Sequence, residues 1–399
     1  MRRTGLAAVL FFLSFVAAAG SAAAEAVDTS AEHAVIMDAD TGQVLWAKDA
    51  DTPAPPASMS KLMTLELLFQ HLKDHRVKLT DTFPVSERAW RERAGSECFV
   101  NIGDKISVEN LIRCVIIMSG NDSCIVIAEG IGGTVENFVA MMNARAKQLG
   151  LRQSHFVNPN GLDQPPGQLM SAMDLAKLAR HLVRDYPEYY HYFGERDFVW
   201  SNIHQHNRNL VLEKFPGADG LKTGHIEASG YGITVSALQN GRRLILVLNG
   251  LRYPDLEKRG GKAQDWFAEQ RRADEAARLL GLAFREFRQY KLFSPGDKVA
   301  DAQVWQGSSD TVALTVQKPV AVTLTPDART AMKVTVSYDG PVQAPIAKGQ
   351  RVGALNVSAP NYPAFNVPLV AAEDVGREGF IGRIFVGLRA AITGHSGGR

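Results

Sequence analysis

The chain has 399 residues, of which 45% are hydrophobic, and this is enough for two domains with buried cores. Its 44 Lys and Arg residues almost balance its 42 Asp and Glu residues, which gives a formal net charge of +2. This balance excludes the bulk electrostatic attraction that a strongly basic chain has for nucleic acid, so we expect no nucleic-acid partner.

The N-terminus has the layout of a secretory signal peptide. Arg2 and Arg3 precede an apolar run from Leu6 to Ala19, and the small residues 22–24 offer a cleavage site before Glu25. The run is shorter than the roughly 20 residues that a transmembrane helix needs. We therefore exclude residues 1–24 from the fold and expect an exported protein; an uncleaved membrane anchor is the alternative.

The region after the signal predicts an α/β domain. Residues 33–51 read as two strands joined by a turn at Asp40, Thr41 and Gly42. Helical spacing follows in several segments: 58–72, 106–131 with a break at 119–121, 134–149, 171–184 and about 265–281. Strand patterns return at 220–224, 229–238 and 242–250, and Asn240 and Gly241 are a strong hairpin signal between the last two. Strands at both ends of a helical middle indicate helices around an antiparallel sheet.

The last third of the chain changes character. Beyond about residue 290, "TVALTV", "VAVTL" and "MKVTVSY" alternate strictly, which predicts a small all-β sandwich domain without catalytic chemistry. Residues 376–399 return to helical spacing and predict an amphipathic helix that lies on an anionic membrane surface. Docking of this helix onto the β domain is the alternative. We thus divide the chain into 1–24, 25–287, 288–375 and 376–399.

Ser58 and Lys61 stand three residues apart near the start of the first predicted helix, so their side chains are neighbours. A serine hydroxyl becomes a good nucleophile when a base takes its proton. A lysine can be that base once burial or nearby charge lowers its pKa. About one such pair is expected by chance in a chain of this length, so the pair alone decides nothing.

Two further short motifs accompany this pair and together suggest a catalytic site. Ser119, Gly120 and Asn121 fall at a predicted helix break, and Lys222, Thr223 and Gly224 fall on a predicted strand. In this order the strings form the S-x-x-K, S-x-N and K-T-G set of penicillin-binding proteins and serine β-lactamases. Each string alone has a simpler interpretation, as a helix cap or a solvated strand. Their joint occurrence favours catalysis.

The mature chain resembles the serine-type D-alanyl-D-alanine carboxypeptidases, the low-molecular-mass penicillin-binding proteins, over nearly its whole length. The resemblance is carried by "AVIMDADTGQVLWAKDAD", "SMSKLMT", "SGNDSCIVIAE", "FVNPNGLD", "DYPEYY", "NRN" and "DGLKTGHIEASGYG". It implies a β-lactamase/transpeptidase-like α/β domain followed by the β domain, in the periplasm, with the C-terminal helix attached to the inner membrane. It also implies peptidoglycan stem peptides ending in D-Ala-D-Ala as substrate, β-lactams as inhibitors, and neither a cofactor nor a metal. Between about 252 and 270 the chain is longer than the family pattern.

The resemblance implies a role for each catalytic residue. Ser58 attacks the carbonyl between the last two D-alanines. Lys61, whose pKa is lowered beside the cation Lys222, accepts the proton. Ser119 relays a proton to the leaving amine.

The resemblance also assigns the residues that bind substrate. The Asn121 amide holds the acyl part, and the backbone N–H groups of Ser58 and His225 form the oxyanion hole. Gly224, which has no Cβ, leaves room for substrate against the strand edge. The terminal carboxylate is bound by Lys222, Thr223 and Arg272, although a solvated surface arginine is the alternative for Arg272.

Four alternative functions are compatible with the same fold. Transpeptidases and endopeptidases employ the same residues, and the sequence does not separate them from a carboxypeptidase. A β-lactamase of one class uses a glutamate for deacylation, but no glutamate lies between Glu136 and Glu188. A non-catalytic peptidoglycan-binding module has no need for a serine nucleophile and two lysines.

Cysteines and histidines give weaker signals. Cys98, Cys114 and Cys124 make an odd count, so at least one is unpaired or pairs between chains, and Cys124 reads as a small buried thiol. His204 and His206, two residues apart, can face one metal ion from a strand. Because no third ligand is near them in the sequence, we expect a surface strand or loop there and no metal site.

Overall fold

The computed structural model describes residues 27–92, 94–256 and 261–379. These residues form two compact units, with the division between Glu286 and Phe287. The predicted signal peptide and residues 380–399 of the predicted C-terminal helix lie outside the described residues.

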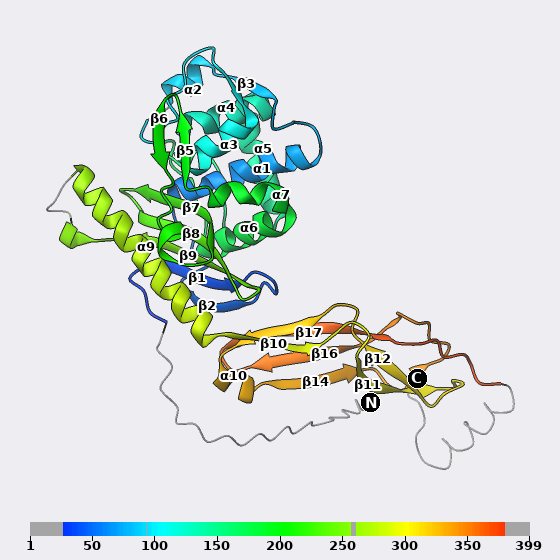
Figure 1. The fold of residues 1–399 in the computed structure, drawn as a ribbon. Helices are drawn as coiled ribbons and strands as arrows, with labels where there is room; N and C mark the ends of the chain where they lie inside the picture. The colour runs from blue at the N-terminus through cyan, green and yellow to red at the C-terminus, as the bar shows by residue number, and fades with distance from the viewer. Residues whose placement is uncertain (1–26, 93, 257–260, 380–399) are drawn as a thin grey trace. The chain divides into compact units, whose positions relative to one another are not determined.

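The first unit is built on a five-stranded antiparallel sheet with the strand order β2-β1-β9-β8-β7 (Figure 1). Its strands are β1 (His33–Asp38), β2 (Val44–Lys48), β7 (Ala218–Ile226), β8 (Gly230–Gln239) and β9 (Arg242–Leu251). Val35 in β1 pairs with Val247 in β9, so the two ends of this unit meet in one sheet, as the sequence predicts. Asn240 and Gly241 have φ angles of 51° and 75°, as a tight hairpin between β8 and β9 requires.

Helices surround this sheet, and the helical predictions are confirmed. Among the described residues they are α1 (Lys61–Lys73), α2 (Glu87–Arg91), α3 (Val108–Ile116), α4 (Asn121–Gly132), α5 (Val135–Gln148), α6 (Ala172–Asp185), α7 (Pro187–Tyr190), α8 (Val211–Lys214) and α9 (Gly261–Glu286), with 3₁₀ turns η1 (Ala57–Ser60), η2 (His191–Gly194) and η3 (Pro254–Leu256). Ser107, Thr134 and Ser171 cap α3, α5 and α6 through their hydroxyl oxygens. The last helix is longer than the predicted 265–281.

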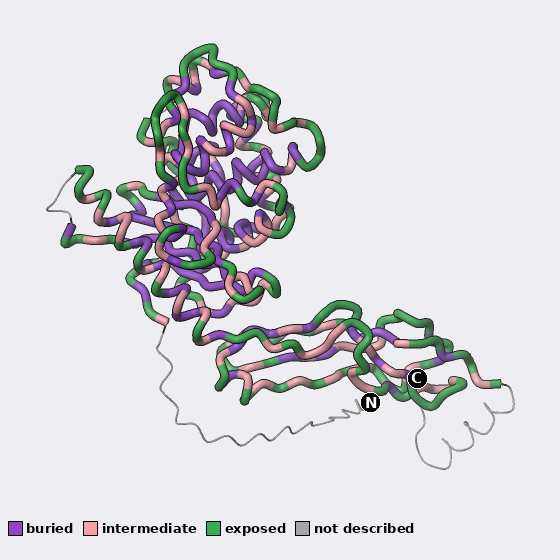
Figure 2. Tube along the Cα trace, viewed as in Figure 1, coloured by how far each residue is buried: buried purple, intermediate pink, exposed green. Residues whose placement is uncertain are grey.

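The two faces of the sheet are buried under different helices. In β1, Val35 and Met37 belong to the large core that includes residues of α1 and α6, whereas Ala34 and Ile36 alternate with them and are also fully buried. α6 packs on β1 and β9, and α9 packs on β8 and β9. The sheet is therefore a buried middle layer, and Figure 2 shows the buried residues concentrated there and in the helices beside it.

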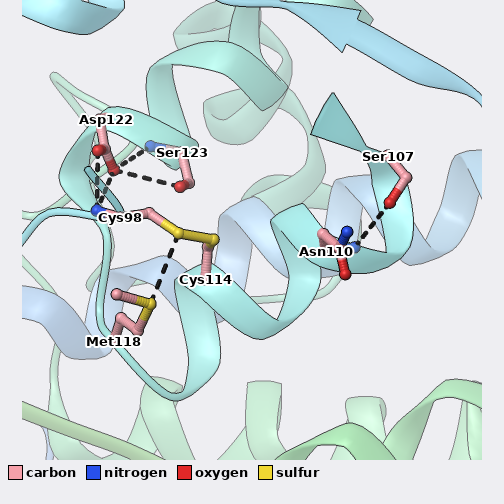
Figure 3. Close-up of a disulfide and its surroundings, with 7 residues drawn as sticks. All are labelled: Cys98, Ser107, Asn110, Cys114, Met118, Asp122 and Ser123. Atoms are coloured by element: carbon pink, nitrogen blue, oxygen red, sulfur yellow. Dashed lines mark hydrogen bonds between the residues drawn. A yellow bond between two sulfur atoms is a disulfide. The ribbon is translucent and has the colours of Figure 1, made fainter. Parts of the chain in front are cut away.

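Two small antiparallel strand pairs and a disulfide complete the first unit. β3 (Thr82–Pro84) pairs with β4 (Lys105–Ser107) across a connection that contains α2, and β5 (Asp197–Trp200) forms a short hairpin with β6 (Ile203–His206). Cys98 and Cys114 form a disulfide that fastens the loop before β4 to α3 (Figure 3). Cys124 is a free, buried thiol, as expected from the odd cysteine count.

The second unit is all-β, as the alternating pattern predicts. Its strands are β10 (Arg288–Phe293), β11 (Lys298–Trp305), β12 (Thr311–Thr315), β13 (Val320–Leu324), β14 (Lys333–Tyr338), β15 (Val342–Gln343), β16 (Arg351–Ala359) and β17 (Tyr362–Ala371), with one short helix, α10 (Pro326–Thr330). Six strands form a sheet in the order β14-β16-β17-β12-β11-β15, and β10 pairs with β13. Their inward residues form a separate apolar core around Val312, Leu314, Leu355 and Leu369.

The first residues of the predicted C-terminal helix are extended. Ser308 N–H donates to the Gly376 carbonyl, and Glu378 N–H donates to the Gln306 carbonyl. The prediction of a helix from residue 376 is therefore wrong for residues 376–379, because their backbone groups pair with a neighbouring segment. Of the described helices, none is by itself long and apolar enough to cross a bilayer; α4 and α5 together pass that test but bend by 84° between them.

Candidate active site

Ser58 lies in the 3₁₀ turn η1, directly before α1, and not within the regular helix that its spacing predicts. The turn is set by the preceding residue, Ala57, whose φ of 50° is left-handed and unusual for a residue with a side chain. Gly161 packs against this turn so closely that a Cβ there would lie 2.1 Å from the Ala57 carbonyl oxygen. The backbone beneath the Ser58 hydroxyl is therefore held by close packing.

Lys61 is completely buried and its ammonium group has three partners. Nζ donates to Ser58 Oγ at 2.7 Å, to Asn121 Oδ1 at 2.7 Å and to the Asn160 carbonyl at 2.5 Å. Burial lowers the pKa of Lys61 to about 8. Asn121 Oδ1 and the Asn160 carbonyl only accept hydrogen bonds, so a neutral Lys61 can keep one N–H for each and direct its lone pair at the Ser58 hydroxyl.

Ser119 and Asn121 occupy the connection between α3 and α4. Ser119 is buried and has a left-handed φ of 59°, a strained conformation of the kind that occurs at functional sites. The helix-cap interpretation does not hold, because Gly120 is the N-cap of α4 and makes no side-chain capping bond. The Asn121 amide is oriented on both sides, since Nδ2 donates to the Ala94 carbonyl at 2.6 Å while Oδ1 accepts from Lys61.

Lys222 and Thr223 lie on β7, an edge strand of the sheet, and both side chains are buried. Lys222 Nζ donates to the Thr223 carbonyl at 3.1 Å. The pKa of Lys222 is lowered well below its ordinary value by burial first and then by Lys61, Arg208 and Arg272. The solvated-strand interpretation of Lys222 is thus excluded. The main cause of the lowered pKa of Lys61 is burial, and not Lys222 as the resemblance implies.

Close packing explains why residue 224 is a glycine, and the sequence does not reveal this packing. A Cβ on this residue would lie 2.8 Å from the Pro56 carbonyl oxygen and 3.2 Å from the Ala57 Cβ. The absence of a side chain therefore lets β7 pack directly on the turn that carries Ser58. The expected reason, space for substrate at the strand edge, stays a prediction. His225, the next residue, is exposed and its ring stacks on Tyr231 at a centroid distance of 3.7 Å.

Arg272 is buried, so its interpretation as a solvated surface arginine is wrong. Its Nη1 donates to the Gly224 carbonyl at 3.3 Å, and its Nη2 donates to the Arg208 carbonyl at 3.5 Å. Its Nε has no hydrogen-bond partner among the described residues. Arg208 in turn donates to Ser96 Oγ. Two guanidinium groups and two lysines thus give this site a concentration of positive charge.

Three of these neighbours have no role in the sequence-based prediction. The Asn160 carbonyl and Gly161 come from "FVNPNGLD", and Arg208 comes from "NRN", strings that the resemblance includes without assigning functions. The sequence signal for the Asn160 carbonyl and Gly161 is the polar Asn-Pro-Asn-Gly string, and the structure shows that its asparagines are buried. Burial raises the pKa of the Cys124 thiol to about 12, so this nearby cysteine stays protonated and is no competing nucleophile.

The fold and the serine–lysine arrangement define the class of serine penicillin-binding proteins, and comparisons with known proteins agree. Residues 19–251 match the family described as D-alanyl-D-alanine carboxypeptidase (peptidase S11), and residues 287–377 match the C-terminal domain of penicillin-binding protein 5. The chain belongs to the D-alanyl-D-alanine carboxypeptidase family.

Its relatives are similar along nearly the whole chain. D-alanyl-D-alanine carboxypeptidase DacD of Salmonella typhimurium is 34% identical over 96% of this chain and 97% of its own. DacC of Escherichia coli is also 34% identical, over 95% of this chain and 92% of its own.

A solved structure shares the architecture. Penicillin-binding protein 5 of Haemophilus influenzae aligns with a TM-score of 0.77 and 32% identity, over 88% of this chain and 99% of that one. This similarity confirms the expected fold: a transpeptidase-like α/β domain followed by an all-β domain.

Proposed function

We propose that the protein is a serine D-alanyl-D-alanine carboxypeptidase that removes the terminal D-alanine from peptidoglycan stem pentapeptides through an acyl-enzyme on Ser58. The observation that carries the proposal is the 2.7 Å contact between Lys61 Nζ and Ser58 Oγ, made by a buried lysine with a lowered pKa. The two acceptors that hold the other N–H groups of Lys61 leave its lone pair for the serine proton.

In the acylation step, Ser58 Oγ bonds to the carbonyl carbon of the penultimate D-alanine while Lys61 takes the hydroxyl proton. The backbone N–H groups of Ser58 and His225 stabilise the oxyanion, a contribution of about 3–4 kcal/mol per donor. The C–N bond then breaks, and the proton held by Lys61 passes by way of Ser119 to the leaving amine. Water attacks the ester carbonyl while Lys61 accepts its proton; the ester C–O bond breaks, the acid product leaves, and Lys61 returns the proton to Ser58 Oγ.

The buried cations support the proposed recognition of a free C-terminal carboxylate. Lys222 and Arg272 are buried with few compensating charges, and the Arg272 Nε lacks a partner among the described residues. An arriving carboxylate supplies the missing negative charge and acceptors, and the Thr223 hydroxyl adds a hydrogen bond. β7 is an edge strand, so an extended peptide can lie alongside it as an additional strand.

The decisive experiment incubates the mature protein with a muropeptide pentapeptide and follows products by mass spectrometry. Loss of one terminal D-alanine is expected, and Ser58→Ala abolishes it. Crosslinked products instead indicate a transpeptidase, and cleavage of crosslinked dimers indicates an endopeptidase. Labelled penicillin is expected to remain on the Ser58 peptide; rapid release of hydrolysed penicillin supports a β-lactamase. If Ser58→Ala is labelled like the wild type, the assignment of the nucleophile is wrong.

We also propose that the enzyme works in the periplasm, attached to the inner membrane by residues 376–399. The disulfide between Cys98 and Cys114 supports an oxidising compartment. From Arg377 to the C-terminus, the sequence has four arginines and one acidic residue, Glu378, a balance that suits anionic lipid headgroups.

The membrane proposal is tested by deleting residues 380–399, which leaves the pairing of Gly376 and Glu378 intact. The shortened protein is expected to bind penicillin normally but not to co-sediment with anionic liposomes. If the full mature protein does not co-sediment either, the chain does not attach to membranes in this way.

A further inference from the structure

The hairpin of β5 and β6 brings two histidines and an aspartate together on the protein surface. His204 and His206 are two residues apart on β6, so their side chains lie on the same face of the strand. Asp197 on β5 is the cross-strand partner of His206. The third ligand is not adjacent to the histidines along the chain, so their spacing alone does not reveal it. Antiparallel pairing supplies it from the neighbouring strand.

The ligand atoms of these three residues converge. Asp197 Oδ1 lies 2.5 Å from His206 Nδ1 and 3.3 Å from His204 Nε2. All three ligand atoms lie within 4.8 Å of one another. Among the described residues, this is the one cluster of three His, Cys, Asp or Glu side chains close enough to hold a metal ion. The side chains are exposed, so an ion can reach them and they can adjust their rotamers without disturbing a core.

We propose that Asp197, His204 and His206 form a divalent metal site for which Zn²⁺ is the best-fitting ion. Two imidazole nitrogens and one carboxylate oxygen form one of the ligand sets of three-residue zinc sites, which keep a further position for water or another donor. Zinc bonds of about 2.0–2.1 Å at a tetrahedral angle place neighbouring ligand atoms about 3.3 Å apart. The separation between Asp197 Oδ1 and His204 Nε2 already has this value, and small rotations bring in His206 Nδ1.

The hairpin position indicates what the ion does. Asn207, directly after His206, closes the base of the hairpin, because its N–H donates to the Arg196 carbonyl and its Nδ2 donates to the Glu195 carbonyl. Arg208 follows and donates to Ser96 Oγ. A metal ion that joins β5 to β6 therefore fastens the segment that leads to Arg208. Its role is structural, and the Ser58 chemistry does not pass through it.

The test uses mature protein purified with a tag that contains no histidine, stripped with a chelator and then dialysed against micromolar Zn²⁺. Bound metal is measured by elemental analysis. One equivalent per chain is expected, with a higher melting temperature than the stripped protein has. Asp197→Ala, His204→Ala and His206→Ala are each expected to weaken binding about tenfold or more. His191→Ala, at an exposed histidine outside the cluster, is the matched control.

Penicillin labelling of Ser58 shows that each variant is folded, since none of the three ligands takes part in acylation. Co²⁺ substitution gives a second readout, because visible absorption bands report the ligand set. The proposal is overturned if the wild-type protein retains no zinc, or if it retains one equivalent that the variant lacking all three ligands also retains.

Discussion

Lys61 Nζ donates a hydrogen bond of 2.7 Å to Asn121 Oδ1, although 60 residues separate them in the chain. The same ammonium group contacts Ser58 Oγ. This bond joins two of the three sequence motifs directly. Because the lysine is buried, its pKa is lowered and it can act as the base for Ser58.

The first prediction concerns pH. Burial lowers the pKa of Lys61 from 10.5 to about 8, and only the neutral amine can accept the Ser58 proton. Below that pKa, each unit of increasing pH raises the neutral fraction about tenfold, so penicillin acylation is expected to accelerate from about pH 6 and level off above about pH 8. The apparent value belongs to the coupled lysines and not to Lys61 alone. Rates that stay constant across this range contradict the general-base role.

The second prediction tests the hydrogen bond between Lys61 and Asn121. Asn121→Ala removes the acceptor and leaves the Ala94 carbonyl without its amide donor, so acylation by labelled penicillin is expected to fall about 10- to 100-fold. Asn137→Ala, at an exposed position on α5, is the matched control and should label at the wild-type rate. Equal rates for the two variants mean that Asn121 does not position the base.

The third prediction concerns recognition of the carboxylate. Lys222→Met and Arg272→Met each remove a buried cation, and kcat/KM for a pentapeptide with a free C-terminus is expected to fall about 10- to 100-fold. A substrate that ends in D-alanine amide should be a poor substrate for all three proteins. The variants are expected to be no less stable than the wild type, because an uncompensated buried charge is lost. An unchanged preference for the free acid in both variants contradicts the proposed binding site.

The fourth prediction concerns the contact between β7 and the turn that carries Ser58. Gly224→Ala places a methyl group 2.8 Å from the Pro56 carbonyl, which must move together with the turn. We expect a loss of about 1–3 kcal/mol in the free energy of unfolding and slower acylation. In contrast, the nearest atom to a Cβ on Gly281 in α9 is 3.8 Å away. Gly281→Ala should therefore stabilise the protein by up to about 1 kcal/mol. Normal acylation in Gly224→Ala shows that the close packing is unnecessary.

The fifth prediction concerns the disulfide shown in Figure 3. Cys98 and Cys114 are 16 residues apart, and closing a loop of this size stabilises a protein by about 3 kcal/mol. Replacing both cysteines by serine is expected to lower the melting temperature by roughly 6–12 °C. Acylation should also slow, because the tethered loop contains Ser96, whose carbonyl accepts from Asn121 N–H.

A reducing agent should lower the melting temperature of the wild-type protein by a similar amount and leave the double variant unchanged. A melting temperature that responds to reduction in the double variant points to another cause.

Elements whose signals are local can be predicted from the sequence. Strict alternation predicts the β domain, helical spacing predicts the helices, and Asn240 with Gly241 predicts the hairpin between β8 and β9. The candidate residues can also be identified from the sequence. Each of the three motifs is only a few residues long, so it can be read without knowledge of distant contacts, and the order of the motifs is typical of the family.

Which groups are buried, and what surrounds them, depends on packing between distant segments. Lys61 and Arg272 look like any other cation in the sequence, and only packing removes their solvent and lowers their pKa values. The Asn160 carbonyl comes to Lys61 from 99 residues away, and Asp197 comes to the histidines from the paired strand. Sequence periodicity reports which face of an element is apolar, but contacts between distant segments are set by how those faces pack together.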